Sequence, residues 1–153
     1  MPARPTGILF AAAIAVVFGA LSVRPSEACA DGIPEIAVAW LDDVAMARWT
    51  ASGPVIYYNP TRCTAVGSAV CSFIRMHEYG HIALNHASAY YSGFGGRALA
   101  EAEADCWAGR NARLYQVRAA IAYFLSPEMI DYDAGDHGTG RVRAKRIAEC
   151  RGI

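Results

Sequence analysis

The chain has 153 residues, a length that suits one modest domain and is too short for two ordinary ones. Its 14 basic and 14 acidic residues cancel at neutral pH, so the charge balance predicts neither a nucleic-acid-binding nor a membrane-surface protein. Hydrophobic residues make up 54% of the sequence, but the apolar N-terminal segment inflates this figure.

The first 30 residues are typical of a secretory signal peptide. Arg4 gives a positive start, residues 7–21 form an uncharged apolar run, and Ala28 and Ala30 offer small-residue cleavage sites. This run is shorter than the about 20 residues that a bilayer-spanning helix needs, so an uncleaved membrane anchor is the weaker alternative. The sequence therefore predicts a signal peptide over residues 1–30 and an exported domain, periplasmic or secreted, after it.

Two elements are expected at the start of the exported domain, residues 31–153. Apolar residues recur at three- and four-residue steps from residue 34 to residue 50, among them Ile36 and Trp40, which predicts a first helix. The β-branched and aromatic run Val55–Tyr58 follows and predicts a strand, closed by Asn59-Pro60.

The rest of the chain is predicted to be helical apart from two loops. Ser68 is the expected N-cap of a second helix that runs to about Asn85, and a loop rich in tyrosine and glycine follows it. A third helical stretch covers residues 97–125, with Gly109 as the candidate bend. Residues 131–140 are acidic and glycine-rich, which indicates a loop.

A last short helix is expected to begin at Thr139 or Gly140. Its basic residues are predicted to form a solvated face rather than a binding patch: Arg141, Arg143, Lys145 and Arg146. The fold class predicted from these elements is mainly α (α+β), with a small sheet or a single strand.

Removal of the leader leaves four cysteines, and an even number in a small exported domain predicts two disulfides. Four cysteines permit three pairings, and four buried thiols are the alternative. We favour one bond that closes a short loop ahead of the second helix and one that ties the C-terminus to the third, namely Cys63–Cys71 and Cys106–Cys150.

The motif His77-Glu78-Tyr79-Gly80-His81 carries the chemistry of the sequence. At 3.6 residues per turn, His77 and His81 lie on the same face of a helix, where two neutral imidazoles can bind one zinc ion. Glu78 can then accept a proton from a water molecule as general base. The alternative is an ordinary polar helix face, because a motif this short also occurs by chance.

A catalytic zinc site needs a third protein ligand. His86 lies nine residues after His77, half a turn around the helix, so it is expected to face away. The acidic run downstream offers better candidates: Glu101 and Asp105 share a helix face, whereas Glu103 is turned about 200° from Glu101. Spacing alone does not choose between Glu101 and Asp105, and a solvated acidic face is the alternative.

The H-E-x-x-H motif followed by Glu101-Ala-Glu-Ala-Asp105 resembles the gluzincin metallopeptidases, and the nearest groups are the neutral zinc metallopeptidases and the CaaX prenyl protease/HtpX-like peptidases. The resemblance implies a minimal zincin-like domain. It also implies that Glu101 is the third zinc ligand and that Asp105 orients a ligating histidine. It covers about residues 68–147, and the chain is much shorter than the HtpX-like group and lacks its transmembrane bundle.

A downstream His-Gly segment leading to an arginine also resembles the neutral metallopeptidases. Here it reads Asp136-His137-Gly138-Thr139-Gly140-Arg141. Two roles for His137 remain open: a catalytic hydrogen bond to the oxyanion of the reaction, or a structural bond that fixes the loop.

The expected function is zinc-dependent hydrolysis of a peptide or protein substrate, with Zn²⁺ as the cofactor. The strand Val55–Tyr58 is expected to pair with the substrate backbone. Two alternatives remain: a non-catalytic zinc-binding or partner-binding module on the same scaffold, and a disulfide-bonded structural domain without a metal. No nucleic-acid partner is expected, and membrane association only through an uncleaved N-terminal segment.

Overall fold

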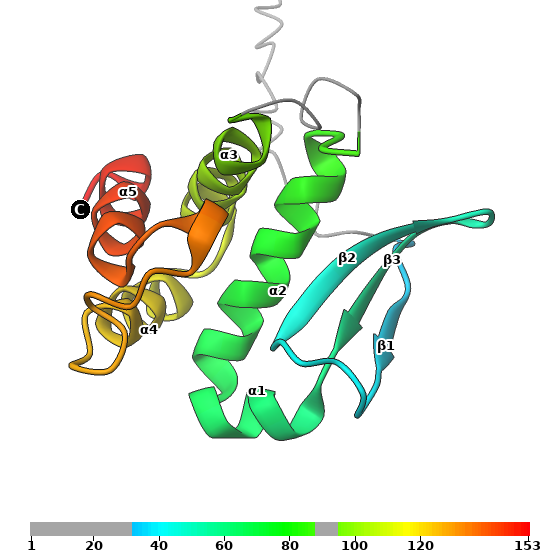
Figure 1. Ribbon diagram of the computed structural model, residues 1–153, viewed down its shortest axis with the longest axis horizontal. Helices are drawn as coiled ribbons and strands as arrows, with labels where there is room; N and C mark the ends of the chain where they lie inside the picture. The colour runs from blue at the N-terminus through cyan, green and yellow to red at the C-terminus, as the bar shows by residue number, and fades with distance from the viewer. Residues whose placement is uncertain (1–31, 88–94) are drawn as a thin grey trace, which may run out of the picture.

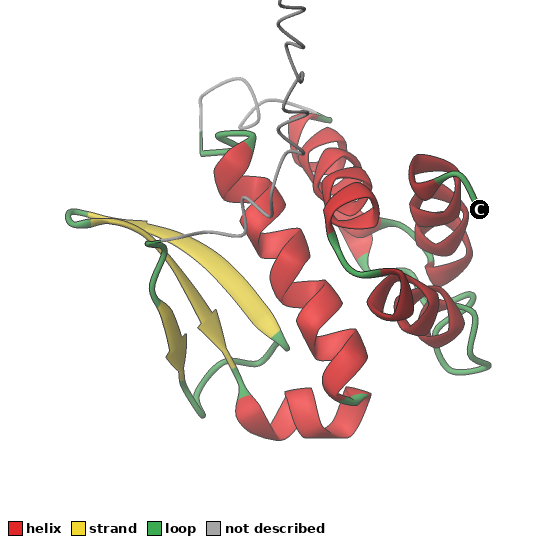
Figure 2. Ribbon diagram, turned by 180° about the vertical axis from the view of Figure 1, so that it is seen from behind, coloured by secondary structure: helices red, strands yellow, loops and turns green. Residues whose placement is uncertain are grey.

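The computed structural model describes residues 32–87 and 95–153, so the predicted signal peptide and most of the Tyr/Gly-rich loop lie outside the described residues. A long central helix, α2 (Ser68–Ala83), separates two groups of elements (Figure 1). A small sheet lies on one side of it and the helices that follow it in the chain lie on the other, which the view from behind shows equally well (Figure 2). The predicted class, mainly α with a small sheet, is confirmed.

The sheet has three strands in the order β1-β3-β2: β1 (Glu35–Ala37), β2 (Ala45–Thr50) and β3 (Gly53–Tyr58). β3 pairs in parallel with β1 and antiparallel with β2, so β3 is central and β2 forms one edge. The predicted strand Val55–Tyr58 is confirmed, but the prediction that it pairs with substrate is wrong, because both of its edges are occupied.

The helix predicted over residues 34–50 is wrong, because this segment forms β1, β2 and the loop between them. Hydrogen bonds to β3 stabilise both strands, and periodicity within the segment carries no information about that partner. Asn59 fixes the connecting loop, since its side-chain amide donates to the Leu41 carbonyl at 2.8 Å. Tertiary pairing thus overrides a local helical pattern.

A short helix that was not predicted, α1 (Pro60–Val66), leads into α2. Its start follows helix-capping rules: Asn59 Oδ1 accepts from the backbone N–H of Thr61 at 2.9 Å, and proline occupies the first turn. The predicted α2 is confirmed, although Gly67 rather than Ser68 is its N-cap. The predicted Cys63–Cys71 disulfide joins the two helices.

The helical stretch predicted over residues 97–125 consists of two helices, α3 (Gly96–Asn111) and α4 (Leu114–Phe124). The break falls at Ala112 and Arg113, not at Gly109. Gly109 lies inside α3, where a Cβ atom would come within 3.1 Å of the Ile147 carbonyl oxygen. Its function in the fold is close packing against the last helix, and the prediction of a bend there is wrong.

The last helix, α5 (Gly140–Arg151), begins where it was predicted, with Thr139 as its N-cap. A short 3₁₀ turn, η2 (Gly135–His137), precedes it within the predicted loop. The predicted Cys106–Cys150 disulfide joins α3 to α5. The helical core consists of Phe73, Ala108, Ala112, Val117, Ala120, Phe124, Ala144 and Ile147. Among the described residues, no helix has the length and apolar character needed to cross a membrane.

Candidate metal centre

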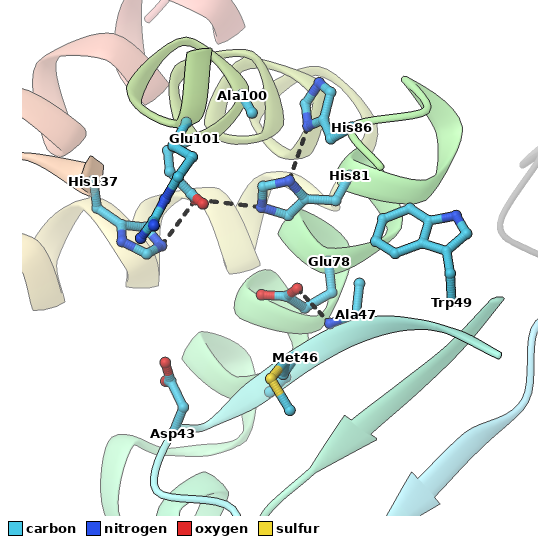
Figure 3. A pocket seen from close by; sticks show the side chains of 12 residues that line it. Asp43, Met46, Ala47, Trp49, Glu78, His81, His86, Ala100, Glu101 and His137 are labelled. Carbon is cyan, nitrogen blue, oxygen red and sulfur yellow. Dashed lines mark hydrogen bonds and ion pairs between the residues drawn. The ribbon is translucent and has the colours of Figure 1, made fainter. Parts of the chain in front are cut away.

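All four histidines of the chain gather on one side of α2. His77 and His81 come from α2 itself, His86 from the turn that follows it, and His137 from η2. In Figure 3 the rings of His81 and His137 lie on either side of Glu101, which α3 supplies, and the ring of His86 lies beyond that of His81. Segments that are distant in sequence thus converge on one point.

Three ligand atoms form a compact triangle at this point. His77 Nε2 lies 3.0 Å from His81 Nε2 and 2.9 Å from Glu101 Oε2, and the third side, His81 Nε2 to Glu101 Oε2, measures 3.3 Å. Ligands of a tetrahedral zinc ion at about 2.0–2.2 Å lie about 3.3–3.6 Å from one another. The triangle is therefore close to one face of such a coordination sphere.

The protonation of His77 supports the same interpretation. Its Nδ1 lies 2.9 Å from Asp105 Oδ1, and an ionised carboxylate only accepts, so Nδ1 carries the hydrogen. Without a metal, Nε2 bonds to the Glu101 carboxylate only by carrying a second hydrogen, whereas in the neutral ring its lone pair is free for a cation. A cation at the centre of the triangle satisfies these acceptor atoms, so the donor set fits a metal ion.

Asp105 is fully buried and connects three helices. Besides His77 on α2, it accepts hydrogen bonds from Arg143 at 2.7 and 3.1 Å and from Arg146 at 3.0 Å, both on α5. The prediction that these two arginines belong to a solvated face is wrong; Arg141 and Lys145 are the solvent-exposed members of that set. Residues 105, 143 and 146 thus hold the His77 ring in place.

The charges of the site alter its acid–base properties. Burial lowers the pKa of His77, but hydrogen bonds to Asp105 and Glu101 outweigh this and raise the pKa to about 9 in the metal-free protein. Burial acts to raise the pKa of Asp105 and Glu101. The cations beside Asp105, and the hydrogen bonds from His137 and His77 to Glu101, outweigh it and hold both pKa values well below the usual range. Both carboxyls are therefore ionised at neutral pH.

Glu78 lies beside the triangle, and its ligand atom is within 4.8 Å of those of His77 and His81. Its Oε2 accepts a 2.7 Å hydrogen bond from the backbone N–H of Ala47 on β2 (Figure 3). Burial raises the pKa of this carboxyl, whereas the neighbouring histidines act to lower it. A buried carboxylate of raised proton affinity, fixed by a backbone donor, has the properties of a general base.

His137 approaches the triangle from η2, beside Glu101. Its Nε2 lies 2.9 Å from Glu101 Oε2, and its ring stacks on His77 with a centroid separation of 5.7 Å. The neighbouring Asp136 forms a 2.7 Å ion pair with Arg97 at the start of α3. The structure thus brings His137 to the site and attaches its loop to α3.

The prediction that His86 faces away is wrong, because its Nδ1 lies 2.8 Å from His81 Nδ1. The helical extrapolation fails because α2 ends at Ala83 and the chain turns back. Burial and the neighbouring His81 lower the pKa of His86, so its ring is neutral at neutral pH. Glu103 points away from the triangle, as predicted, and its carboxylate lies 3.3 Å from His86 Nε2.

A glycine inside the motif permits α2 and α3 to approach closely. A Cβ atom at Gly80 would lie 3.1 Å from Ala104 Cα and 3.3 Å from Trp107 Cβ. Ala104 is fully buried at this contact, between the acids that reach His77. The glycine thus sets the spacing that lets α3 carboxylates reach α2 histidines.

A cavity of about 280 Å³ opens beside the triangle. Part of its lining comes from β2, the edge strand of the sheet, through Ala45, Met46, Ala47 and Trp49. Successive residues of an antiparallel strand direct their backbone N–H and C=O groups to opposite sides, so every second residue directs them to the same side. Because Ala47 N–H points to Glu78, Ala45 and Trp49 also direct theirs away from β3.

Several residues of the site were missed by sequence reasoning: Ala47, Arg143, Arg146 and His86. A backbone donor such as Ala47 leaves no signal in the sequence. The sequence offered one signal for the two arginines. Arg143 precedes Arg146 by three residues and the buried Ile147 by four, which places the arginines beside the apolar stripe of the helix rather than on its solvent face.

No model of a known protein family matches the chain, nor does any curated protein or solved structure. The functional conclusion therefore depends on the site alone.

Proposed function

We propose that this protein is a zinc-dependent hydrolase of peptide bonds, with zinc held by His77, His81 and Glu101. The observation that carries the proposal is the triangle of ligand atoms with the buried Glu78 carboxylate beside it. Two imidazoles and a carboxylate suit zinc, and three protein ligands leave a position for water or substrate, as in catalytic sites.

Each residue around the ion has a different role in the proposed hydrolysis. A bound zinc ion supplies a Lewis acid that lowers the pKa of water towards about 7 and polarises a carbonyl group. Glu78 takes the proton of the attacking water and then delivers it to the leaving amine, for which its raised pKa is suited. Asp105 keeps the proton of His77 on Nδ1, so that Nε2 remains available as a ligand. His137 is the candidate donor to the charge that develops on the substrate oxygen.

The edge strand favours an extended peptide as substrate. The outward backbone groups of the exposed Trp49 on β2 lie beside the cavity, which the buried Ala45 also lines, so this edge is placed to pair with a peptide backbone. Added as a strand beside β2, a peptide passes next to Glu78, which Ala47 of the same strand contacts. The substrate strand is thus expected at β2 rather than at the central β3.

Export belongs to the same proposal. The two disulfides suit an oxidising compartment, in which such bonds persist. A periplasmic or secreted peptidase, released from its signal peptide, is the form that this chemistry favours.

One observation favours the alternative of a non-catalytic zinc-binding module. His77, Glu101 and His137 offer ligand atoms within 4.8 Å of one another, so His137 is placed to act as a fourth protein ligand. Four protein ligands close a zinc site, and closed sites are structural. The alternative then assigns no function to the buried Glu78 carboxylate.

The test compares the wild type with Glu78→Gln, using the purified mature protein. We expect close to one zinc per chain in both by elemental analysis, and peptidase activity on mixed peptides in the wild type only, with a loss of at least about 10²-fold in the variant. Glu149→Gln, an exposed site on α5, is the matched control and is expected to keep full activity. Wild-type protein that holds zinc but cleaves nothing supports the closed module, and a wild type that holds no zinc refutes both.

A further inference from the structure

The second ring nitrogen of His81 faces another histidine. His81 Nε2 belongs to the ligand triangle, and its Nδ1 lies 2.8 Å from His86 Nδ1. A histidine that binds a metal through one nitrogen almost always donates its other N–H to a fixed acceptor, which sets the orientation of the ring. For His77 that acceptor is Asp105, and for His81 the corresponding position is taken by His86.

The end of α2 is built to place His86 there. The His86 N–H bonds to the His81 carbonyl at 2.9 Å, and the Asn85 N–H bonds to the Ile82 carbonyl at 3.1 Å. Asn85 has φ of 55°, the left-handed conformation that closes a helix in this pattern. The turn folds back over the last helical residues, and only 3% of the His86 side chain is exposed.

Glu103 holds the far side of the His86 ring, with its Oε2 3.3 Å from His86 Nε2. The hydrogens can be assigned along this series without conflict. With His81 Nε2 free for the metal, His81 Nδ1–H donates to His86 Nδ1, and the protonated His86 Nε2 faces the Glu103 carboxylate 3.3 Å away. Helix α3 thereby serves both histidines of α2: Glu101 and Asp105 contact His77, and Glu103 reaches His81 through His86.

We propose that His86, oriented by Glu103, is the positioning residue that fixes His81 as a metal ligand. The inference rests on the proposed metal centre and adds a function for two residues that the hydrolytic chemistry does not use. Loss of such an outer contact costs about 10–100-fold in metal affinity. The contact acts on the orientation of the ring, so a substitute acceptor at the same position is expected to restore binding.

The experiment measures the zinc affinity of the mature protein by competition with a chromophoric chelator. His86→Ala is expected to weaken zinc binding about 10–100-fold. His86→Asn places an amide oxygen near the position of Nδ1 and is expected to recover most of that loss. Glu103→Gln, at a side chain that is 40% exposed, is expected to lose less than His86→Ala, with Glu149→Gln as its matched surface control.

The visible absorption of the cobalt-substituted protein gives a second readout of ligand geometry. It is expected to change in His86→Ala and to return towards the wild-type spectrum in His86→Asn. A zinc affinity in His86→Ala equal to that of the wild type overturns the inference. An equal loss of zinc affinity in His86→Ala and His86→Asn also overturns it, because it indicates that His86 serves only in packing. If the wild type binds no zinc, the proposed metal centre itself is refuted. If the wild type binds zinc and His86→Ala binds it with the same affinity, the metal centre stands and only this inference is refuted.

Discussion

Replacing Asp105 with alanine tests whether this buried carboxylate supports the fold as well as the site. The substitution removes the acceptor of four hydrogen bonds, one from His77, two from Arg143 and one from Arg146. Arg143 also stacks on Phe124, 4.2 Å from the ring centroid, so its guanidinium is held in place and cannot readily move to solvent. The variant therefore leaves a partly buried charge without its partner.

The size of the effect follows from this geometry. Removing one partner of a buried ion pair costs about 3–5 kcal/mol, a large share of the about 5–15 kcal/mol that stabilises an ordinary domain. For a domain of this size 1 kcal/mol corresponds to about 4 °C, so the unfolding midpoint is expected to fall by about 12–20 °C. Zinc affinity is expected to fall about 10–100-fold in the same variant.

Thermal unfolding of the metal-free protein, followed by circular dichroism, is the appropriate assay, because bound zinc would add its own stabilisation. Asp131→Ala is the matched control. Asp131 also pairs with an arginine, Arg141, at 3.0 Å, but its side chain is 77% exposed. Such a pair contributes about 0–1 kcal/mol. If Asp105→Ala destabilises the protein no more than this control, the argument that Asp105 connects the three helices is refuted.

Two further predictions concern the ligands. Glu101→Ala removes one of three protein ligands, so elemental analysis is expected to find no zinc in this variant. The control variant Glu149→Ala on α5 is expected to keep the metal. Full zinc occupancy in Glu101→Ala would show that the ligand set is wrong. The pH dependence of stability provides the second test. The folded-state pKa of His77 is raised to about 9, so the metal-free protein is expected to lose stability, on the order of 3 kcal/mol, as pH rises from about 6.5 through 9. Because zinc takes the place of the proton, denaturant unfolding of the zinc-loaded protein is expected to lack this loss, and an identical pH profile with and without zinc would contradict it.

Local sequence patterns were sufficient for the helices that carry the site. The important residues of the α2 motif and of the acidic run on α3 lie within one or two helical turns of each other. The face on which each side chain lies therefore follows from helical geometry. Glu101 and Asp105 could not be distinguished by spacing, because both lie on the face that meets α2. In the structure they contact different nitrogens of the same His77 ring, so both belong to the site.

Features that depend on a distant partner could not be predicted in this way. The segment from residue 34 to residue 50 forms strands only because β3 provides hydrogen bonds to both of them. The position of His86 depends on where α2 ends, and a left-handed Asn85 reverses the chain there. Extrapolating a regular helix past its end gave the wrong direction for that side chain.

The contact at Gly80 has a consequence for the variability of the metal-binding motif. In the pattern H-E-x-x-H the fourth position is nominally free, yet here any side chain at residue 80 would press on the backbone of Ala104. Gly80→Ala would move α3 outward by a few tenths of an ångström, and Glu101 with it. The sides of the ligand triangle that end on Glu101 measure 2.9 and 3.3 Å. A shift of a few tenths of an ångström is at least as large as the about 0.2 Å by which metal–ligand distances can vary. A residue that contacts no ligand atom thus determines whether two helices can share one ion.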